Sequence, residues 1–302
     1  MTIERAPKTV HPTIGLYLSG LRAGESRRSV RSRLRAVAEF FGYPTVHDAP
    51  WGELDYEHVQ TILNWCRERG LAPNPVNHYR SVLLGVARTA FLKGEMSERR
   101  YRRIQAVPRD KGCRLPAGRD IEDSERQALL DSCDGTVRGV RDRAILEVLH
   151  STGLRASELV GLDGDAYNAR DGALSVLGKG GRERTVWLTA AARAALESLL
   201  ERVGQDGPIF QTVTKWGRFA EKRLSTRGLA HALSTRCKST GVAAVSPHDF
   251  RRTHVGDLLD AGVDLAVAQR LLGHGDPSTT SRYDRRSNER LKEAVMRLES
   301  GQ

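Results

Sequence analysis

The sequence His248-Asp-Phe-Arg251, followed by Leu271-Leu-Gly-His274 and then by Tyr283, says more about the architecture than any other part of the chain. Two histidines, an arginine and a tyrosine occur here in an order that suits attack on a phosphodiester. His248 and Arg251 are three residues apart, so on one helix their side chains point the same way. We therefore expect a tyrosine nucleophile with fixed cations around it.

A second arginine stands far upstream, in Thr152-Gly-Leu-Arg155, with Glu158 three residues further on. The glycine allows a sharp bend into a new helix. The planar guanidinium of Arg155 can hold two phosphate oxygens at once and does not lose its charge. Glu158 is one helical turn away, where we expect it to brace an active-site side chain. Taken alone, the segment is equally typical of an ordinary helix N-terminus.

Cleaving DNA without a metal needs a nucleophile, cations for the non-bridging oxygens and an acid for the leaving oxygen. Lys179 is predicted to stand on a glycine-rich hairpin turn. A lysine at such a turn is usually solvated, but a lysine on a flexible loop also suits an acid that must reach the leaving oxygen. Metal binding by His248 and His254 is disfavoured, because six residues apart on a helix they face different sides. His274 taken alone is more typical of a helix cap.

Tyr283 is distinguished from the other tyrosines by its neighbours Arg282, Arg285 and Arg286. Most tyrosines in proteins are half-buried structural residues. Positive charge, however, stabilises a phenolate, whose ordinary pKa is about 10. The motifs also lack the cluster of carboxylates that a metal-dependent nuclease needs. We predict that no metal site is present and that Tyr283 is the nucleophile.

The composition favours a polyanionic partner. The 302 residues carry 48 Lys+Arg against 37 Asp+Glu, a net charge of +11, although a merely soluble basic protein fits this charge equally well. The four cysteines are scattered and are expected to be reduced thiols, which excludes a disulfide framework or zinc knuckle. No apolar run approaches the roughly 18 residues that span a bilayer. With no signal peptide evident, we expect a cytoplasmic protein with no membrane partner.

Residues 1–108 are predicted to form an all-helical bundle. In one helix, Val30, Leu34, Val37 and Phe41 share an apolar face, and Gly42-Tyr-Pro44 ends it. A second helix is expected over residues 56–69 and a third after Pro75. A solvated helix surface is the commoner explanation of any one row of arginines, but two rows on a basic bundle favour a DNA-facing surface. The arginines in these rows are Arg28, Arg31, Arg35 and Arg80.

Residues 109–118, rich in proline, glycine and charge, are predicted to link this bundle to a second domain over residues 119–302. The alternating segments 173–177 and 184–188 predict an antiparallel hairpin. The fold class is therefore mainly α with a small antiparallel β-sheet. Helices are expected over residues 122–132, 138–151, 189–203, 225–239, 248–261, 265–272 and 287–299.

This ordered set resembles the tyrosine recombinases, also called the phage integrase family, over nearly the whole chain. Each motif alone is weak evidence for the family, but the complete set in this order is specific to it. One departure is Phe250-Arg251-Arg252, where the family often has Leu-Arg-His; we expect Arg252, like Arg282, to contact DNA. The family's catalytic residues match Arg155, Lys179, His248, Arg251, His274 and Tyr283, with separations of 24, 3, 23 and 9 residues on either side of the variable gap from Lys179 to His248.

The resemblance implies an N-terminal SAM-like helical bundle and a C-terminal α+β catalytic domain, which together form a C-shaped clamp on DNA. It implies site-specific recombination by transesterification, with a 3′-phosphotyrosine on Tyr283 and a leaving 5′-hydroxyl that Lys179 protonates. No metal, ATP or other cofactor is expected. The expected partner is double-stranded DNA, bound by a homotetramer on paired sites that is a monomer or dimer off DNA.

The expected role is integration and excision, or resolution, of a mobile element or replicon in the cytoplasmic nucleoid. The target sequence and any accessory directionality proteins are left open. Two alternatives are a catalytically silent DNA-binding or architectural protein and a type IB topoisomerase-like enzyme. The complete residue set argues against the first. The spacing and a predicted tail helix argue against the second. On that helix Leu291, Val295 and Leu298 form an apolar stripe, which we expect to dock either on a neighbouring protomer or on its own domain.

Overall fold

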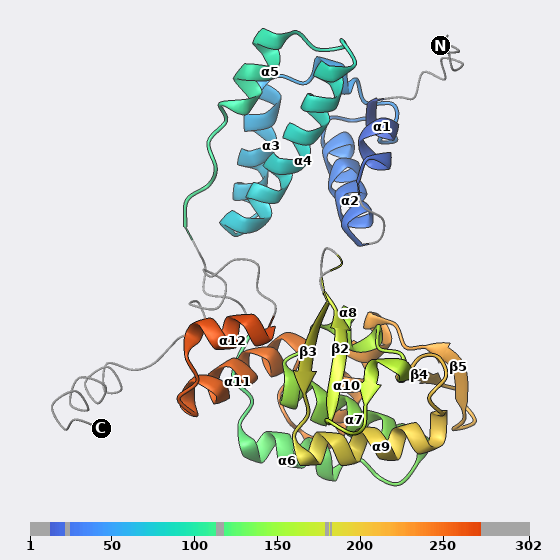
Figure 1. Cartoon of the computed structure of the whole chain (residues 1–302). Coiled ribbons are helices and arrows are strands. Elements are labelled where there is room, and N and C mark those ends of the chain that lie inside the picture. Colours follow the sequence, from blue (N-terminus) through green and yellow to red (C-terminus); the bar gives the residue numbers. More distant parts are fainter. Residues whose placement is uncertain (1–12, 22–24, 113–117, 179–180, 182, 273–302) are drawn as a thin grey trace, which may run out of the picture. The chain divides into compact units, whose positions relative to one another are not determined.

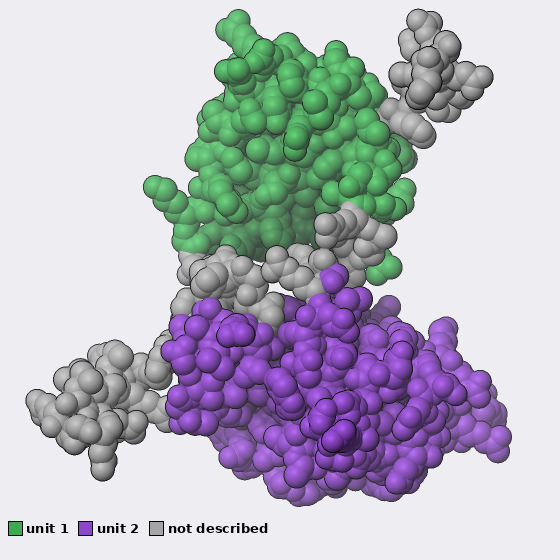
Figure 2. Space-filling view, in the orientation of Figure 1, with its two compact units in different colours: residues 1–115 green, residues 116–302 purple. Residues whose placement is uncertain are grey.

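The computed structural model describes residues 13–21, 25–112, 118–178, 181 and 183–272. The chain divides into two compact units, Met1–Leu115 and Pro116–Gln302 (Figure 2). The C-shaped clamp stays a prediction. Every helix in the described ranges is too short or too polar to span a bilayer.

Unit 1 is a helical bundle with a single apolar core (Figure 1). The longest of its helices, Pro73–Leu92, packs against each of the others. Its elements are α1 (Thr13–Ser19), α2 (Glu25–Phe40), η1 (Trp51–Glu53), α3 (Tyr56–Glu68), α4 (Pro73–Leu92) and α5 (Glu98–Gln105).

The predicted apolar face of α2 is present, since Leu34 and Val37 are buried in the core. The predicted start of α4 after Pro75 is wrong. The helix begins at Pro73, because the fixed φ of proline suits the first helical turn, where its missing N–H has no intrahelical partner to lose. Asp55 caps α3 by accepting a hydrogen bond from the backbone N–H of His58.

The chain that follows α5 is held against unit 1 by buried and half-buried polar groups. Arg80 Nε donates to the carbonyl oxygen of Val107 at 2.7 Å. Asn77 exchanges two hydrogen bonds with the backbone of Asp110, at 3.0 and 2.9 Å. The guanidinium of Arg80 thus helps to fix the exit of the chain from unit 1, and its contact with DNA stays a prediction.

Unit 2 is built around α7, which is buried along most of its length. It packs against α6, α9, α11 and both small sheets, and its own cluster of apolar side chains forms the main core. The elements are α6 (Asp123–Asp131), α7 (Val137–Thr152), α8 (Ala156–Val160), η2 (Gly164–Ala166), β1 (Tyr167–Asn168), β2 (Ala173–Leu177), β3 (Glu183–Trp187), α9 (Ala190–Val203), β4 (Gln211–Val213), β5 (Phe219–Arg223), α10 (Thr226–Thr240), α11 (Pro247–Asp260) and α12 (Leu265–Leu272).

The predicted hairpin is present as β2 and β3, which pair antiparallel with Leu174 opposite Val186. The structure adds β1 to form a sheet of order β1-β2-β3, and it adds a second antiparallel pair, β4-β5, that the sequence did not predict. The mainly helical fold with small antiparallel sheets is confirmed.

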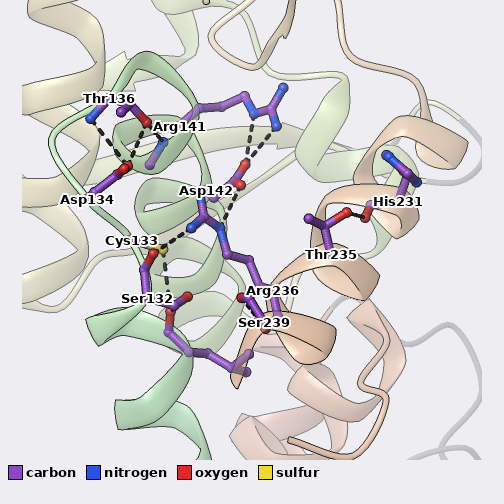
Figure 3. Close-up of polar contacts among 12 residues, drawn as sticks. Ser132, Cys133, Asp134, Thr136, Arg141, Asp142, His231, Thr235, Arg236 and Ser239 are labelled. Carbon is purple, nitrogen blue, oxygen red and sulfur yellow. Dashed lines mark hydrogen bonds and ion pairs between the residues drawn. The ribbon is translucent and has the colours of Figure 1, made fainter. Parts of the chain in front are cut away.

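A buried charge cluster joins α6, α7 and α10 (Figure 3). Asp142 accepts from Arg141 at 3.0 and 2.7 Å and from Arg236 Nε at 2.9 Å. Arg236 Nη1 also donates to the carbonyl oxygen of Ser132. Removing one partner would leave an uncompensated buried charge, so the cluster fixes how these helices pack.

Candidate active site

The position of Arg155 is set by the end of α7. Gly153 ends this helix in the left-handed region, with φ of +58°, a conformation that glycine adopts without strain. A Cβ on Gly153 would lie 2.9 Å from His254 Cδ2, so close packing also requires glycine. The chain then turns, Leu154 is buried, and Arg155 becomes the N-cap residue of α8.

Glu158 is buried on α8 and binds Arg155 twice. Its carboxylate accepts from the backbone N–H of Arg155 at 3.0 Å and from Nη1 of the same residue at 2.7 Å. Burial alone would raise the pKa of Glu158, but hydrogen bonds from Arg184 and Arg155 outweigh it and lower the pKa to about 2. Glu158 is therefore ionised at neutral pH and fixes a guanidinium whose side chain is still 38% exposed.

Arg251 is the most enclosed cation of the site, with 3% of its surface exposed. Its Nη1 donates to the carbonyl oxygen of Gly153 and its Nη2 to that of Leu272, both at 2.8 Å. These contacts tie α11 to the end of α7 and to the end of α12. The guanidinium is thus held in one orientation by the fold.

His248 lies in the first turn of α11, which Ser246 caps by accepting from the backbone N–H of Asp249. Partial burial lowers the pKa of His248, and the positive charges of Arg251, Arg252 and Arg155 lower it further, against the opposing pull of Asp249. The imidazole is therefore mainly neutral at pH 7. Arg251, on the same helix as His248, donates to the carbonyl oxygen of Gly153, two residues before Arg155, so the start of α11 and the start of α8 lie near the same end of α7.

His254 is the other member of the disfavoured metal pair. It packs against Gly153, and burial lowers its pKa to about 4. Arg252 also has a different use from the DNA contact that the sequence suggested. With 4% of its surface exposed, it donates to Asp120 at 2.8 Å and to the carbonyl oxygen of Gly118 at 3.2 Å.

Arg184 was missed by sequence reasoning. It lies on β3, and its guanidinium binds both oxygens of Glu158 and the carbonyl oxygen of Leu271. An arginine on a short strand is usually a solvated edge residue, so no local signal marks it. The predicted site residues Lys179, His274, Arg282 and Tyr283 and the tail helix lie outside the described residues.

The fold and the site together define a class: an α+β domain that gathers two arginines and a histidine from the ends of separate helices. The family model for the phage integrase family matches residues 119–290. The tyrosine recombinase XerD of Pseudomonas putida is 30% identical over 302 residues, which cover 95% of this chain and 97% of that protein. XerD of Listeria monocytogenes is 31% identical over 244 residues, 80% and 81% of the two chains. The chain belongs to the phage integrase family, the tyrosine recombinases.

Solved structures share the fold at low sequence identity. The Tn1549 transposon integrase in complex with transposon right end DNA matches with a TM-score of 0.69 and 15% identity, covering 95% of this chain and 99% of that one. A lambda integrase dimer bound to a COC′ core site matches with a TM-score of 0.65 and 18% identity, covering 89% and 96%.

Proposed function

We propose that this chain is a site-specific DNA recombinase that cuts and rejoins strands through a phosphotyrosine on Tyr283. The observation that carries the proposal is the convergence of Arg155, His248 and Arg251, with Arg251 fixed by two backbone carbonyls. Two guanidinium groups beside a neutral imidazole suit a phosphate whose negative charge increases during attack. Family membership supports the same assignment for the residues outside the described ranges.

In the proposed reaction, the phenol of Tyr283 gives up its proton to water, and its oxygen forms a bond to the scissile phosphorus as the bond from phosphorus to the 5′-oxygen breaks. Lys179 gives its proton to the leaving 5′-oxygen, and Arg155 and Arg251 neutralise the non-bridging oxygens. His248 and His274 hydrogen-bond to the phosphate. A 5′-hydroxyl from a partner duplex then reverses the step. The ester keeps the energy of the broken bond, so no ATP is consumed.

The proposed partner is double-stranded DNA, bound by a homotetramer on paired sites. A lambda integrase tetramer bound to a Holliday junction shares the fold, with a TM-score of 0.65 and 18% identity. In unit 1, Arg28, Arg31 and Arg35 are exposed on α2, and we include them in the surface that meets DNA. The biological role that we propose is integration, excision or resolution of a mobile element or replicon in the cytoplasm.

The covalent step is tested by capturing protein-bound DNA from cells that express the chain, sequencing its ends, and rebuilding the site as a nicked suicide substrate. The wild-type chain should form a denaturant-resistant adduct on this substrate. Tyr283→Phe should bind the same DNA and form none, because only the phenol can become esterified. Tyr101→Phe, which removes another tyrosine hydroxyl, is the matched control and should form the adduct normally.

The same assay separates the alternatives. A silent architectural protein would bind the site without any adduct, and a topoisomerase-like enzyme would relax supercoiled plasmids that lack the site. An adduct that persists in Tyr283→Phe would remove this residue from its assigned role.

Cleavage should also proceed in a chelator. The proposed phosphate charge is balanced by two arginines, which need no divalent ion. We expect the rate of adduct formation in EDTA to equal that in magnesium within about threefold once ionic strength is matched. Abolition of cleavage by EDTA, with DNA binding retained, would show that a metal performs this step.

A further inference from the structure

Arg184 occupies a position between three parts of the proposed site. It lies on β3, the strand that follows the turn bearing Lys179. Nη1 and Nη2 donate to the two oxygens of Glu158 at 3.2 and 2.8 Å, and Nε donates to the carbonyl oxygen of Leu271 at 3.1 Å. One guanidinium therefore joins β3 to α8 and to the end of α12; α8 and α12 are drawn on the side of unit 2 opposite α9 (Figure 1).

The Glu158 carboxylate is shared evenly between two arginines. Oε1 accepts from Arg155 Nη1 and Arg184 Nη1, and Oε2 accepts from the backbone N–H of Arg155 and from Arg184 Nη2. Only 4% of the Glu158 side chain is exposed, so water cannot replace these donors without rearrangement. Removal of the Arg184 guanidinium would leave half of the hydrogen bonds unmade and free the carboxylate to rotate away from Arg155.

The end of α12 is held by two arginines on consecutive carbonyls. Arg184 binds the carbonyl oxygen of Leu271, and Arg251 binds that of Leu272. The last carbonyls of a helix have no intrahelical donors, and cations are favourable there. The two arginines therefore fix the end of α12, which lies two residues before His274 in the sequence.

All three nitrogens of Arg184 donate to Glu158 or to the carbonyl oxygen of Leu271. We therefore assign Arg184 no direct contact with the scissile phosphate. Its effect on an anion must pass through Glu158 and through the end of α12.

We propose that Arg184 is a positioning residue, which holds Arg155 through Glu158 and fixes the end of α12. This proposal rests on the proposed recombinase function. It differs from a role in folding alone, because it predicts a loss in the rate of strand cleavage that depends on Glu158.

The matched control is Arg223, which holds the other end of α8. Its Nη1 donates to the carbonyl oxygens of Val160 and Leu162 at 2.9 and 3.2 Å, and its Nη2 pairs with Asp163. Like Arg184, it is a strand arginine that binds carbonyls and a carboxylate. It has no contact with Glu158, so it reports the structural cost of removing such an arginine.

The test compares full-length Arg184→Met, Arg184→Lys, Glu158→Gln, the Arg184→Met/Glu158→Gln double variant and Arg223→Met. Single-turnover adduct formation, DNA affinity and melting temperature are measured for each. We expect Arg184→Met to slow adduct formation roughly 10–100-fold, the usual cost of removing a group that orients an active-site side chain, with DNA affinity within about threefold of wild type. Arg184→Lys should recover part of the rate, because an ammonium can still donate to Glu158.

The double variant should be no slower than the slower single variant, because both changes remove one connected unit. Arg223→Met should lower the melting temperature and leave the rate unchanged. Equal rate losses in Arg184→Met and Arg223→Met, or rate losses that multiply in the double variant, would overturn the proposal. A rate loss matched by an equal drop in DNA affinity would show direct phosphate binding instead and overturn it too.

A pH profile supplies a readout that a purely structural role would not move. Without Arg184 the pKa of Glu158 should rise from about 2, so the carboxylate begins to protonate nearer neutrality. The rate of Arg184→Met relative to wild type should therefore fall from pH 7 to pH 5, and Arg184→Met/Glu158→Gln should show no such fall. An identical profile in both variants contradicts the proposal. Wild type and Tyr283→Phe test the proposed recombinase function separately. If that function is wrong, no chain forms the adduct, wild type included.

Discussion

At the scale of single residues, Gly153 connects the fold to the chemistry. Its positive φ ends α7, its missing side chain admits His254, and its carbonyl oxygen receives Arg251. The turn at this residue also brings Arg155 to the start of α8. A packing requirement and a catalytic requirement therefore meet in one backbone position, which explains why Gly-Leu-Arg is a compact sequence motif.

Arg155→Ala should separate chemistry from binding. The guanidinium is partly exposed and held by Glu158, so its removal deletes a phosphate donor without opening the core. Adduct formation should fall roughly 10²–10³-fold, the usual cost of one preorganised donor. Arg193→Ala is a matched control, because Arg193 pairs with Glu197 at similar exposure on α9. Equal rates in the two variants, measured by single-turnover cleavage with saturating enzyme, would exclude Arg155 from catalysis.

At the scale of elements, α7 and α11 form the scaffold that carries the site. They pack against each other, with His254 of α11 beneath Gly153 and His150 of α7 half-buried beside it. This interface is apolar enough to keep both imidazoles neutral, since burial lowers the pKa of each. Its stability should therefore depend on pH.

The free energy of unfolding should decrease below neutrality. The pKa of His254 is about 4 in the folded chain against 6.5 ordinarily, so between these values the unfolded chain binds more protons and acid favours unfolding. The contribution of His254 to the free energy of unfolding is complete above pH 6.5, and at pH 5 it is smaller by about 2 kcal/mol. His254→Asn should reduce the change in melting temperature between pH 7 and pH 5. His231→Asn, which removes an exposed histidine of α10, should leave the wild-type slope unchanged; equal slopes in all three chains would contradict this assignment.

Elements with one apolar face could be predicted from the sequence, and others could not. Leu34 and Val37 recur at helical spacing, so the pattern predicted α2. The residues of β5 are mostly exposed, so no alternation marks that strand. Arg184 was missed for a different reason: its partners Glu158 and Leu271 are 26 and 87 residues away. Local pattern shows which residue types carry the chemistry, whereas contacts between distant elements appear only in the folded chain.

At the scale of the whole molecule, the two units have separate cores, and we propose a separate task for each. The core of unit 1 comprises residues of the helical bundle alone, and that of unit 2 surrounds α7. The site residues that the structure describes belong to unit 2. Unit 1 contributes exposed basic side chains, among them the arginines of α2, and thus serves binding more than cleavage in our account.

Replacing Arg28, Arg31 and Arg35 together with alanine should weaken DNA binding in a salt-dependent way. The plot of log K against log salt should become less steep by about 0.9 for each phosphate that the protein no longer neutralises. Cleavage at saturating protein should be unchanged. Replacement of Arg170, Arg193 and Arg202, which removes the same charge from unit 2 around α9, is the control. A slope equal to that of the control would place the α2 arginines away from DNA.

The central claim is that Tyr283 becomes esterified to DNA. The most direct measurement is to trap the cleaved complex, digest both the protein and the DNA, and locate the nucleotide by mass spectrometry. The account predicts a nucleotide joined through its 3′-phosphate to Tyr283. A nucleotide on another residue, or cut DNA with no protein ester, would contradict it.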